Sequence, residues 1–321
     1  MIPLVSVVMP VYNGEEYIAE AIQSILAQTF ADFELIIVDD GSRDRSVEII
    51  REYMNRDERI RFLRHETNRG RTDARNTAIA AAKGQYVTFM DCDDVSLPER
   101  LRKQVDYLES HPELGGAGAW GRTVRHDMSP YWRIYHVPSQ HALIAWEMFF
   151  DEAFLGATLM YRRDVLVSAG GFEPGRRYVD DRELQFRLIA DANVRFGNVT
   201  EELYIYRIHN QPKTYDKVVQ DQLHEAYQAL RRHYLERLWD EAPQEILDRF
   251  WHLLHRGKLS WRERRAAKRD IKRLIDAMIA RNWIEPGDMP LLIAEMNRLL
   301  ERASPRLWQM FCHWRRHHFE R

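Results

Sequence analysis

The sequence is poor in cysteine and has no long apolar run. Its 321 residues include two cysteines, Cys92 and Cys312, so disulfide bridges cannot form the framework of the fold. No apolar stretch approaches the roughly 20 residues that a membrane-spanning helix needs. The N-terminal segment MIPLVSVVMPVYN has no Lys or Arg before its apolar residues and continues into turn residues. This pattern indicates a first strand rather than a signal peptide, and we expect a cytoplasmic protein.

Two phosphate-binding motifs are also missing. The turn after the first expected strand lacks the G-x-G-x-x-G pattern of a dinucleotide site, and no G-x-x-x-x-G-K-[ST] segment is present. A nucleotide bound by this chain would therefore need another partner for its phosphates. A divalent cation is the natural candidate.

The composition is that of a globular protein, with 45% hydrophobic and 30% charged residues. The net charge of -2 hides an asymmetry. From residue 216 onward the chain carries 21 Lys and Arg against 16 Asp and Glu, and before it 26 against 33. An acidic first part favours a site that uses a cation, and a basic second part favours an anionic neighbour.

Apolar runs and helical patterns alternate in the first part of the chain. Strands are expected at 4–9, 35–38, 60–63 and 86–90, and helices at 15–28, at 71–82 and over the stretch that carries Val47, Ile49, Ile50 and Tyr53. This alternation predicts an α/β fold with a doubly wound, mostly parallel sheet. Residues 114–209 show a mixed pattern, with short strands at 194–196 and 203–208 and a helix near 183–190. From residue 216 only helices are expected: 218–238, 243–255, 261–281, 290–302 and 305–319. We therefore predict two domains, 1–215 and 216–321.

Carboxylates gather after two of the expected strands, where a doubly wound sheet binds its ligands. Asp91-Cys92-Asp93-Asp94 places three of them in four residues, and in an extended segment Asp91 and Asp93 point to the same side. Such a cluster suits Mg²⁺ or Mn²⁺ completed by substrate phosphates. The alternative is a solvated loop that caps the next helix. Asp39-Asp40-Gly41-Ser42 is weaker evidence, because this composition is also ordinary turn chemistry.

Two further candidates lie later in the sequence. Asp180-Asp181 opens a helix-like stretch, where the acids either stabilise the helix dipole or supply a general base. His209 follows a strand pattern and is either structural or a metal ligand. Local sequence does not choose between these alternatives.

Taken together, the motifs resemble glycosyltransferase family 2, the inverting enzymes with the GT-A fold. The resemblance covers residues 3–210. It rests on five motifs in order: Pro10-Val11-Tyr12-Asn13-Gly14-Glu15, Val38-Asp39-Asp40-Gly41-Ser42, Asn68-Arg69-Gly70 with Ala74-Arg75-Asn76, Asp91-Cys92-Asp93-Asp94, and Gly171-Phe172 with Asp180-Asp181.

The resemblance implies a Rossmann-like GT-A domain and a role for each matching residue. The nucleotide-sugar ligands would be Pro10, Tyr12, Asp40, Asn68, Arg75 and Asp91. Asp91, Asp93 and His209 would contact Mn²⁺ or Mg²⁺, with Asp93 the direct ligand, and Asp181 would be the catalytic base. Position 180 is Asp where the family usually has Glu, which leaves the base unaffected but weakens any acceptor-binding role for residue 180.

The predicted function is transfer of a sugar from a nucleoside diphosphate sugar, UDP in the first instance, to an acceptor hydroxyl. A glycan or a lipid-linked acceptor for surface polysaccharide or glycoconjugate synthesis is expected. The alternatives are a non-catalytic nucleotide-sugar-binding scaffold and a nucleotidyltransferase, although the latter usually has a Gly-rich basic loop after the first strand. Sugar specificity is expected in residues 114–175, where Trp120, Trp132 and Trp146 are either specificity or core residues.

The region after residue 216 lies outside the resemblance. Eight basic residues fall between Lys258 and Arg273, and residues 308–319 interleave aromatic and basic side chains. One interpretation is an interfacial helix on anionic lipid at the inner face of the membrane. The other is a helical bundle that packs on the catalytic domain or forms a homodimer. Nucleic-acid binding is not expected, because no recognition motif accompanies the charge.

Overall fold

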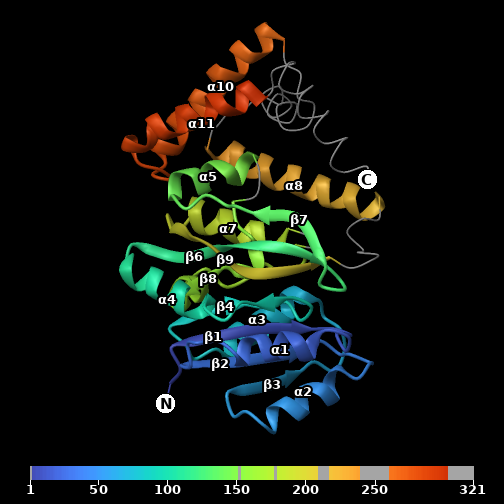
Figure 1. Ribbon diagram of the computed structural model, residues 1–321. Coiled ribbons are helices and arrows are strands. Elements are labelled where there is room, and N and C mark those ends of the chain that lie inside the picture. The colour runs from blue at the N-terminus through green and yellow to red at the C-terminus, as the bar shows by residue number, and fades with distance from the viewer. Residues whose placement is uncertain (1, 151–152, 177–178, 209–216, 239–259, 303–321) are drawn as a thin grey trace. The chain divides into compact units, whose positions relative to one another are not determined.

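The computed structural model describes residues 2–150, 153–176, 179–208, 217–238 and 260–302 (Figure 1). By its internal contacts the chain divides into two compact units. The first comprises residues 1–144 and 152–227, and the second residues 145–151 and 228–321. The domain division at residues 215 and 216 stays a prediction.

The first half of the sheet in the first unit is parallel. Its strands are β1 (Val5–Val11), β2 (Phe33–Asp39), β3 (Ile60–Arg64) and β4 (Tyr86–Phe89), in the order β3-β2-β1-β4. Every residue of β1 and β2 is buried, as expected for parallel strands covered on both faces. The four strands are those predicted. β1 continues through Pro10, however. The pairing of β4 with β1 ends at Val8, so the backbone N–H that proline lacks is not needed to bond β4.

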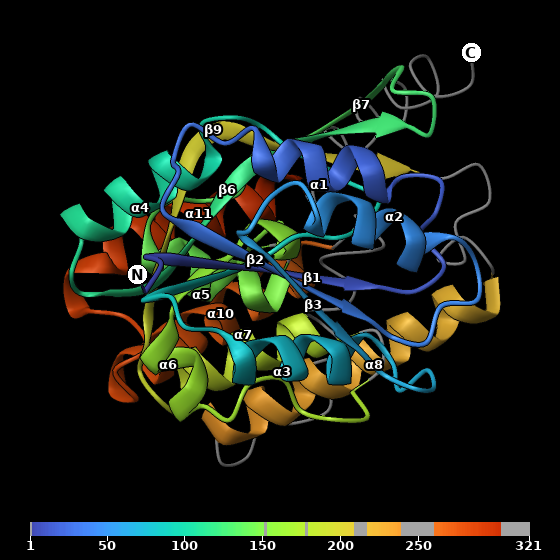
Figure 2. The same cartoon turned by 90° about the horizontal axis from the view of Figure 1, so that it is seen from below.

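Three helices cover the two faces of this parallel half. Figure 2 shows α1 (Ile18–Leu26) and α2 (Ser46–Met54) on one side of the strands and α3 (Arg71–Ala81) on the other. The inward side of α1 is apolar, with Ile18, Ala21, Ile22 and Ile25 buried. The helix begins at Ile18, three residues later than predicted. The backbone N–H groups of Gly14 and Glu15 are already used by Ser46 Oγ and Asp44 Oδ2, at 2.8 and 2.9 Å.

The second half of the sheet is mixed, and it follows β4 in the order β8-β6-β9-β5. These strands are β8 (Met160–Arg162), β6 (Leu114–Arg125), β9 (Arg195–Ile208) and β5 (Val95–Ser96), and β7 (Pro130–Tyr135) pairs with the outer part of β6. β6 and β9 are parallel neighbours, whereas β8, β7 and β5 each pair antiparallel. The two short strands predicted at 194–196 and 203–208 are one continuous strand, because the segment between them also pairs with β6.

Four short elements complete the first unit around the site: α4 (Arg100–Ser110), the 3₁₀ turn η1 (Gly156–Thr158), α6 (Arg163–Ser168) and α7 (Asp180–Ala190). Helix α5 (His141–Phe150) belongs to both units, and so does α8 (Lys217–Leu238). Trp146 on α5 is buried, which supports the core alternative for that residue. Trp120 is half-buried and donates its indole N–H to the Val137 carbonyl at 2.8 Å.

The second unit contains α10 (Trp261–Ala280), the turn η3 (Pro286–Asp288) and α11 (Met289–Arg302). Ser260 and Glu263 form a capping box at the start of α10, which fixes the beginning of that helix. Apolar residues of both helices are buried, among them Ile271, Leu274, Met278, Leu292 and Met296. The helices predicted at 218–238, 261–281 and 290–302 are confirmed. Those predicted at 243–255 and 305–319 lie outside the described residues.

Within the described residues, none of the helices combines the length and the apolar character that crossing a bilayer requires.

Candidate active site

The acidic turn Asp91–Asp94 directly follows β4. Asp94 is buried, whereas the Asp91 side chain keeps 22% of its surface exposed. Burial raises the pKa of the Asp91 carboxyl, and repulsion by Asp93 adds to the effect against the opposing charges of Arg75 and Arg71. Burial also raises the pKa of Asp94 well above its usual value, reinforced by Asp93 and Asp91. The turn therefore holds crowded carboxylates whose negative charges are incompletely compensated.

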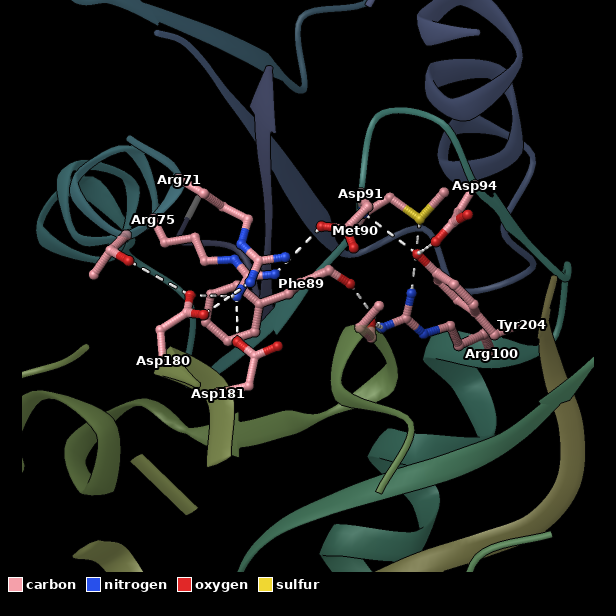
Figure 3. A network of polar contacts seen from close by, with 12 residues as sticks. Arg71, Arg75, Phe89, Met90, Asp91, Asp94, Arg100, Asp180, Asp181 and Tyr204 are labelled. Atoms are coloured by element: carbon pink, nitrogen blue, oxygen red, sulfur yellow. Dashed lines mark hydrogen bonds and ion pairs between the residues drawn. The ribbon is translucent and has the colours of Figure 1, made fainter. Parts of the chain in front are cut away.

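Two arginines of α3 lie between this turn and the first turn of α7 (Figure 3). The guanidinium of Arg75 is 2% exposed and forms ion pairs with Asp91 at 3.3 Å, Asp180 at 3.4 Å and Asp181. Arg71 donates to Asp180 Oδ1 at 2.8 Å. The fold thus brings together residues that are 16 to 109 positions apart in the sequence.

The carboxyl of Asp181 lies at the open side of this network, with 32% of its side chain exposed. Burial is the strongest influence on its pKa and works upward, but the nearby charges of Arg75 and Arg71 outweigh it and hold the pKa below the usual value. Asp181 is therefore ionised at neutral pH. A Cβ atom on Gly156 would lie 2.9 Å from Asp181 Oδ2, so a larger residue in η1 would push this carboxylate out of its present position.

A second acidic turn, the Asp40 turn at Asp39–Ser42, follows β2. Both carboxylate oxygens of Asp40 are hydrogen-bonded. Oδ1 accepts from the backbone N–H of Arg69 at 2.9 Å and lies 2.7 Å from His65 Nδ1, and Oδ2 accepts from the backbone N–H of Gly70 at 2.7 Å. Asp40 is buried. It therefore ties the loop before α3 to the end of β2, and the nucleobase contact that we assigned to Asp40 stays a prediction.

The remaining predicted nucleotide ligands surround these turns. Pro10 is buried near the end of β1, and Tyr12 just beyond it is 47% exposed. Asn68 is exposed on the loop that Asp40 holds, with its backbone 2.9 Å from where a Cβ of Gly41 would lie. Their contacts with a nucleotide stay predictions. His209 lies outside the described residues.

Several residues of the network carry no motif and were not predicted. They are Arg71, Arg100, Tyr204 and Arg207. Arg100 is fully buried and donates to Thr88 Oγ1, to the Phe89 carbonyl and to the Ala157 carbonyl at 2.7 to 3.0 Å. A charged residue inside an amphipathic helix pattern is the one sequence signal that marks it.

The donor set fits a divalent cation completed by substrate. In the described part of the chain, no three His, Cys, Asp or Glu side chains form a ready-made metal cage. Asp91 and Asp93 offer carboxylate oxygens, and Mg²⁺ is commonly held by one or two carboxylates together with substrate phosphates. Burial first, and then the neighbouring carboxylates, raise the pKa values of Asp91 and Asp94, and a cation beside the turn would favour the ionised forms.

Comparison with known proteins identifies this arrangement. The family model "Glycosyl transferase family 2" matches residues 6–168. The uncharacterized glycosyltransferase MJ1057 of Methanocaldococcus jannaschii is 32% identical over 72% of this chain and 80% of its own length. The O-antigen biosynthesis glycosyltransferase WbnJ of Escherichia coli is 32% identical over 65% of this chain and 82% of its own length.

Two solved structures share the fold. Residues 1–349 of S. aureus TarS, in complex with UDP-GlcNAc, superpose with a TM-score of 0.61 over 93% of this chain and 89% of that one, at 21% identity. The mannosyltransferase PcManGT of Pyrobaculum calidifontis, in complex with GDP-Man and Mn²⁺, gives 0.58 over 94% and 86%, at 18% identity. The GT-A fold expected from the motifs is confirmed. The chain belongs to glycosyltransferase family 2 and is a glycosyltransferase related to enzymes of polysaccharide biosynthesis.

Proposed function

We propose that this enzyme transfers a sugar with inversion from a UDP-sugar to an acceptor hydroxyl and depends on Mn²⁺ or Mg²⁺. The observation that carries the proposal is the placement of Asp181 beside the acidic turn, bridged by Arg75. One carboxylate is thus available to take a proton close to the carboxylates that would hold a leaving diphosphate through a cation.

The acidic and the basic side chains of the site have different proposed roles. Bound at Asp91 and Asp93, Mn²⁺ or Mg²⁺ would supply Lewis-acid stabilisation of the departing diphosphate. Arg75 pairs with Asp181 and holds it in place, and the charges of Arg75 and Arg71 favour its ionised form, which can accept the proton of the acceptor hydroxyl. With one carboxylate as the base, the acceptor hydroxyl would displace the diphosphate in a single in-line step, which gives inversion at the anomeric carbon.

Two relatives in fold bear on the donor. TarS has been crystallised with UDP and with UDP-GlcNAc, and PcManGT with GDP-Man and Mn²⁺. We favour UDP for this chain and treat GDP as the competitor. A glycan or lipid-linked acceptor in surface polysaccharide synthesis is proposed from the relation to WbnJ.

The test is a thermal-shift titration with Mn²⁺ or Mg²⁺ in the presence of UDP or GDP, followed by a donor-hydrolysis screen across nucleotide sugars. We expect metal and UDP together to raise the melting temperature, and Asp93→Ala to abolish the rise while UDP alone gives little. A rise with GDP only would change the donor. The absence of any rise with either nucleotide would contradict the proposal.

We also propose that the exposed face of α10 contacts an anionic lipid surface. Six exposed cations lie along this helix: Arg262, Arg265, Lys268, Arg269, Lys272 and Arg273. The opposite face of α10 is apolar and buried, and this packing keeps the basic face on the surface. Each Lys or Arg near an anionic membrane is worth about 1 kcal/mol. The aromatic and basic segment 308–319 lies outside the described residues.

Sedimentation with phosphatidylglycerol-containing vesicles tests this contact, with phosphatidylcholine vesicles as the neutral comparison. Reversing Arg265, Arg269 and Lys272 to Glu should weaken binding by about 100-fold or more, at about 1 kcal/mol per cation removed. Reversing the exposed Arg43, Arg51 and Lys83 to Glu makes the same change in net charge elsewhere and should have little effect. Equal loss in both variants, or self-association through α10, would refute the lipid proposal.

A further inference from the structure

The hydroxyl of Tyr204 makes two contacts with the acidic turn (Figure 3). It donates to Asp94 Oδ2 at 2.8 Å and accepts from the backbone N–H of Asp91 at 3.3 Å. Tyr204 is fully buried on β9, and β9 pairs with β5 immediately after the turn, with Ser96 opposite Tyr204. One hydroxyl therefore joins the first and last residues of the turn.

Arg207, three residues further along β9, holds the same turn through its backbone N–H and its side chain. Its N–H donates to Asp94 Oδ1 and its Nε donates to the Asp93 carbonyl, both at 2.8 Å. The rest of its guanidinium is anchored by the His126 carbonyl at 2.9 Å and by Glu20 at 2.5 Å. Arg207 is 4% exposed, so these bonds lie largely out of solvent.

These contacts give the aspartates of the turn different roles. Both oxygens of Asp94 accept hydrogen bonds from β9, so Asp94 serves as the attachment point of the turn. Tyr204 and Arg207 hold Asp91 and Asp93 through backbone atoms, and the Asp91 carboxyl also pairs with Arg75 at 3.3 Å. Arg100 supports the arrangement from below, with its guanidinium 5.0 Å from the centre of the Tyr204 ring.

We propose that Tyr204 and Arg207 are positioning residues that aim the Asp91 and Asp93 carboxylates and thereby set the affinity of the site for its divalent cation. The inference rests on the proposed metal dependence. Neither residue acts as an acid, base or metal ligand. Removing such a supporting hydrogen bond typically costs 10- to 100-fold in metal affinity or activity.

The experiment compares Tyr204→Phe with Tyr86→Phe. Tyr86 is also a fully buried tyrosine whose hydroxyl bonds to a carboxylate, that of Glu109, but it lies at the opposite end of β4. The full chain is titrated with Mn²⁺ in the presence of UDP, and in parallel GDP, and the midpoint is read from the thermal shift. Donor hydrolysis at saturating Mn²⁺ supplies the turnover number.

We expect Tyr204→Phe to raise the Mn²⁺ midpoint by about 10- to 100-fold, with turnover at saturating metal recovered to within about threefold of the parent. Arg207→Lys, which keeps the charge near Glu20 and the backbone bond to Asp94 but cannot make all three side-chain bonds, should move the midpoint in the same direction. Tyr86→Phe should leave the midpoint unchanged even if the melting temperature falls. This split separates positioning from a general loss of stability.

The outcomes that oppose the inference are distinct. A parent enzyme that responds to Mn²⁺ together with a Tyr204→Phe midpoint equal to that of Tyr86→Phe would overturn the positioning role alone. A parent enzyme without any metal response would overturn the proposed metal dependence and this inference with it. Asp94→Asn gives a further check, because its effect should overlap with that of Tyr204→Phe in the double variant rather than add to it.

Discussion

The two acidic turns of the first unit look alike in sequence and differ in physics. In the Asp40 turn, protein donors already satisfy the carboxylate of Asp40, which is closed off from solvent. In the acidic turn at Asp91–Asp94, burial and mutual repulsion raise the pKa values of Asp91 and Asp94. The hydrogen bonds of the Asp40 turn stabilise the fold, whereas burial and repulsion in the second turn disfavour the charged forms of Asp91 and Asp94. Paired aspartates at strand ends therefore do not by themselves identify chemistry, and their hydrogen-bond donors must be counted.

The largest expected effect comes from the base beside the second turn. Asp181→Asn should lower turnover in donor hydrolysis by about 10²- to 10⁴-fold, because the amide cannot accept the proton. Donor binding should change by less than tenfold. Asp180→Asn is the matched neighbour, since it removes the same charge one residue away and should cost far less turnover. Equal losses in the two variants would mean that charge near Arg75, rather than base function, explains the effect.

The comparison between the turns predicts stability effects of different size. Asp40→Ala should destabilise the fold by about 2–3 kcal/mol in urea unfolding, because the N–H groups of Arg69 and Gly70 and the buried ring of His65 all lose their carboxylate partner. Asp93→Ala should cost no more than about 0.5 kcal/mol, since it also removes repulsion on Asp91 and Asp94. A large stability loss in Asp93→Ala, or none in Asp40→Ala, would break the distinction.

A smaller effect is expected in the pH dependence. Arg71 and Arg75 lower the pKa of Asp181, so the ionised base persists below the usual range of an aspartate. Arg71→Met removes one of these charges and should raise the pKa, which moves the acid limb of turnover to higher pH by about one unit. The pH profile of donor hydrolysis checks this, with Arg43→Met as control. An acid limb that stays in place or moves to lower pH would contradict the assigned role.

The parallel half of the sheet was predictable because its signals are local. Buried β-branched runs, each followed by a turn and an amphipathic helix, correctly gave β1 to β4 and α1 to α3. β6 was missed because its sequence, LGGAGAWGRTVR, is rich in glycine, which weakens strand signals. The structure explains the glycines: a Cβ on Gly116 would lie 2.8 Å from the Phe196 ring, and one on Gly118 would lie 2.2 Å from Asn198 Oδ1.

The site was predictable where it follows a motif and hidden where it depends on pairing. Asp91, Arg75 and Asp181 were singled out, and the fold brings them into one network. That Arg75 would bond to carboxylates was not foreseen, because nothing local shows that α7 packs beside α3. Tyr204 and Arg207 reach the acidic turn only through the pairing of β9 with β5, which no spacing in the sequence reveals.

The attachment of the acidic turn to β9 also limits when the active site can form during synthesis and folding. Asp94 and its partner Arg207 are separated by 113 positions, so the turn cannot take its final form until the last strand of the sheet has been synthesised. A nascent chain released before that point can complete the local crossovers of β1 to β4 and still lack an assembled centre. Contacts of such long range are slow to form, and this chain places its chemistry on one of them. Catalytic activity would then appear only when the sheet is complete, late in folding and in a single step.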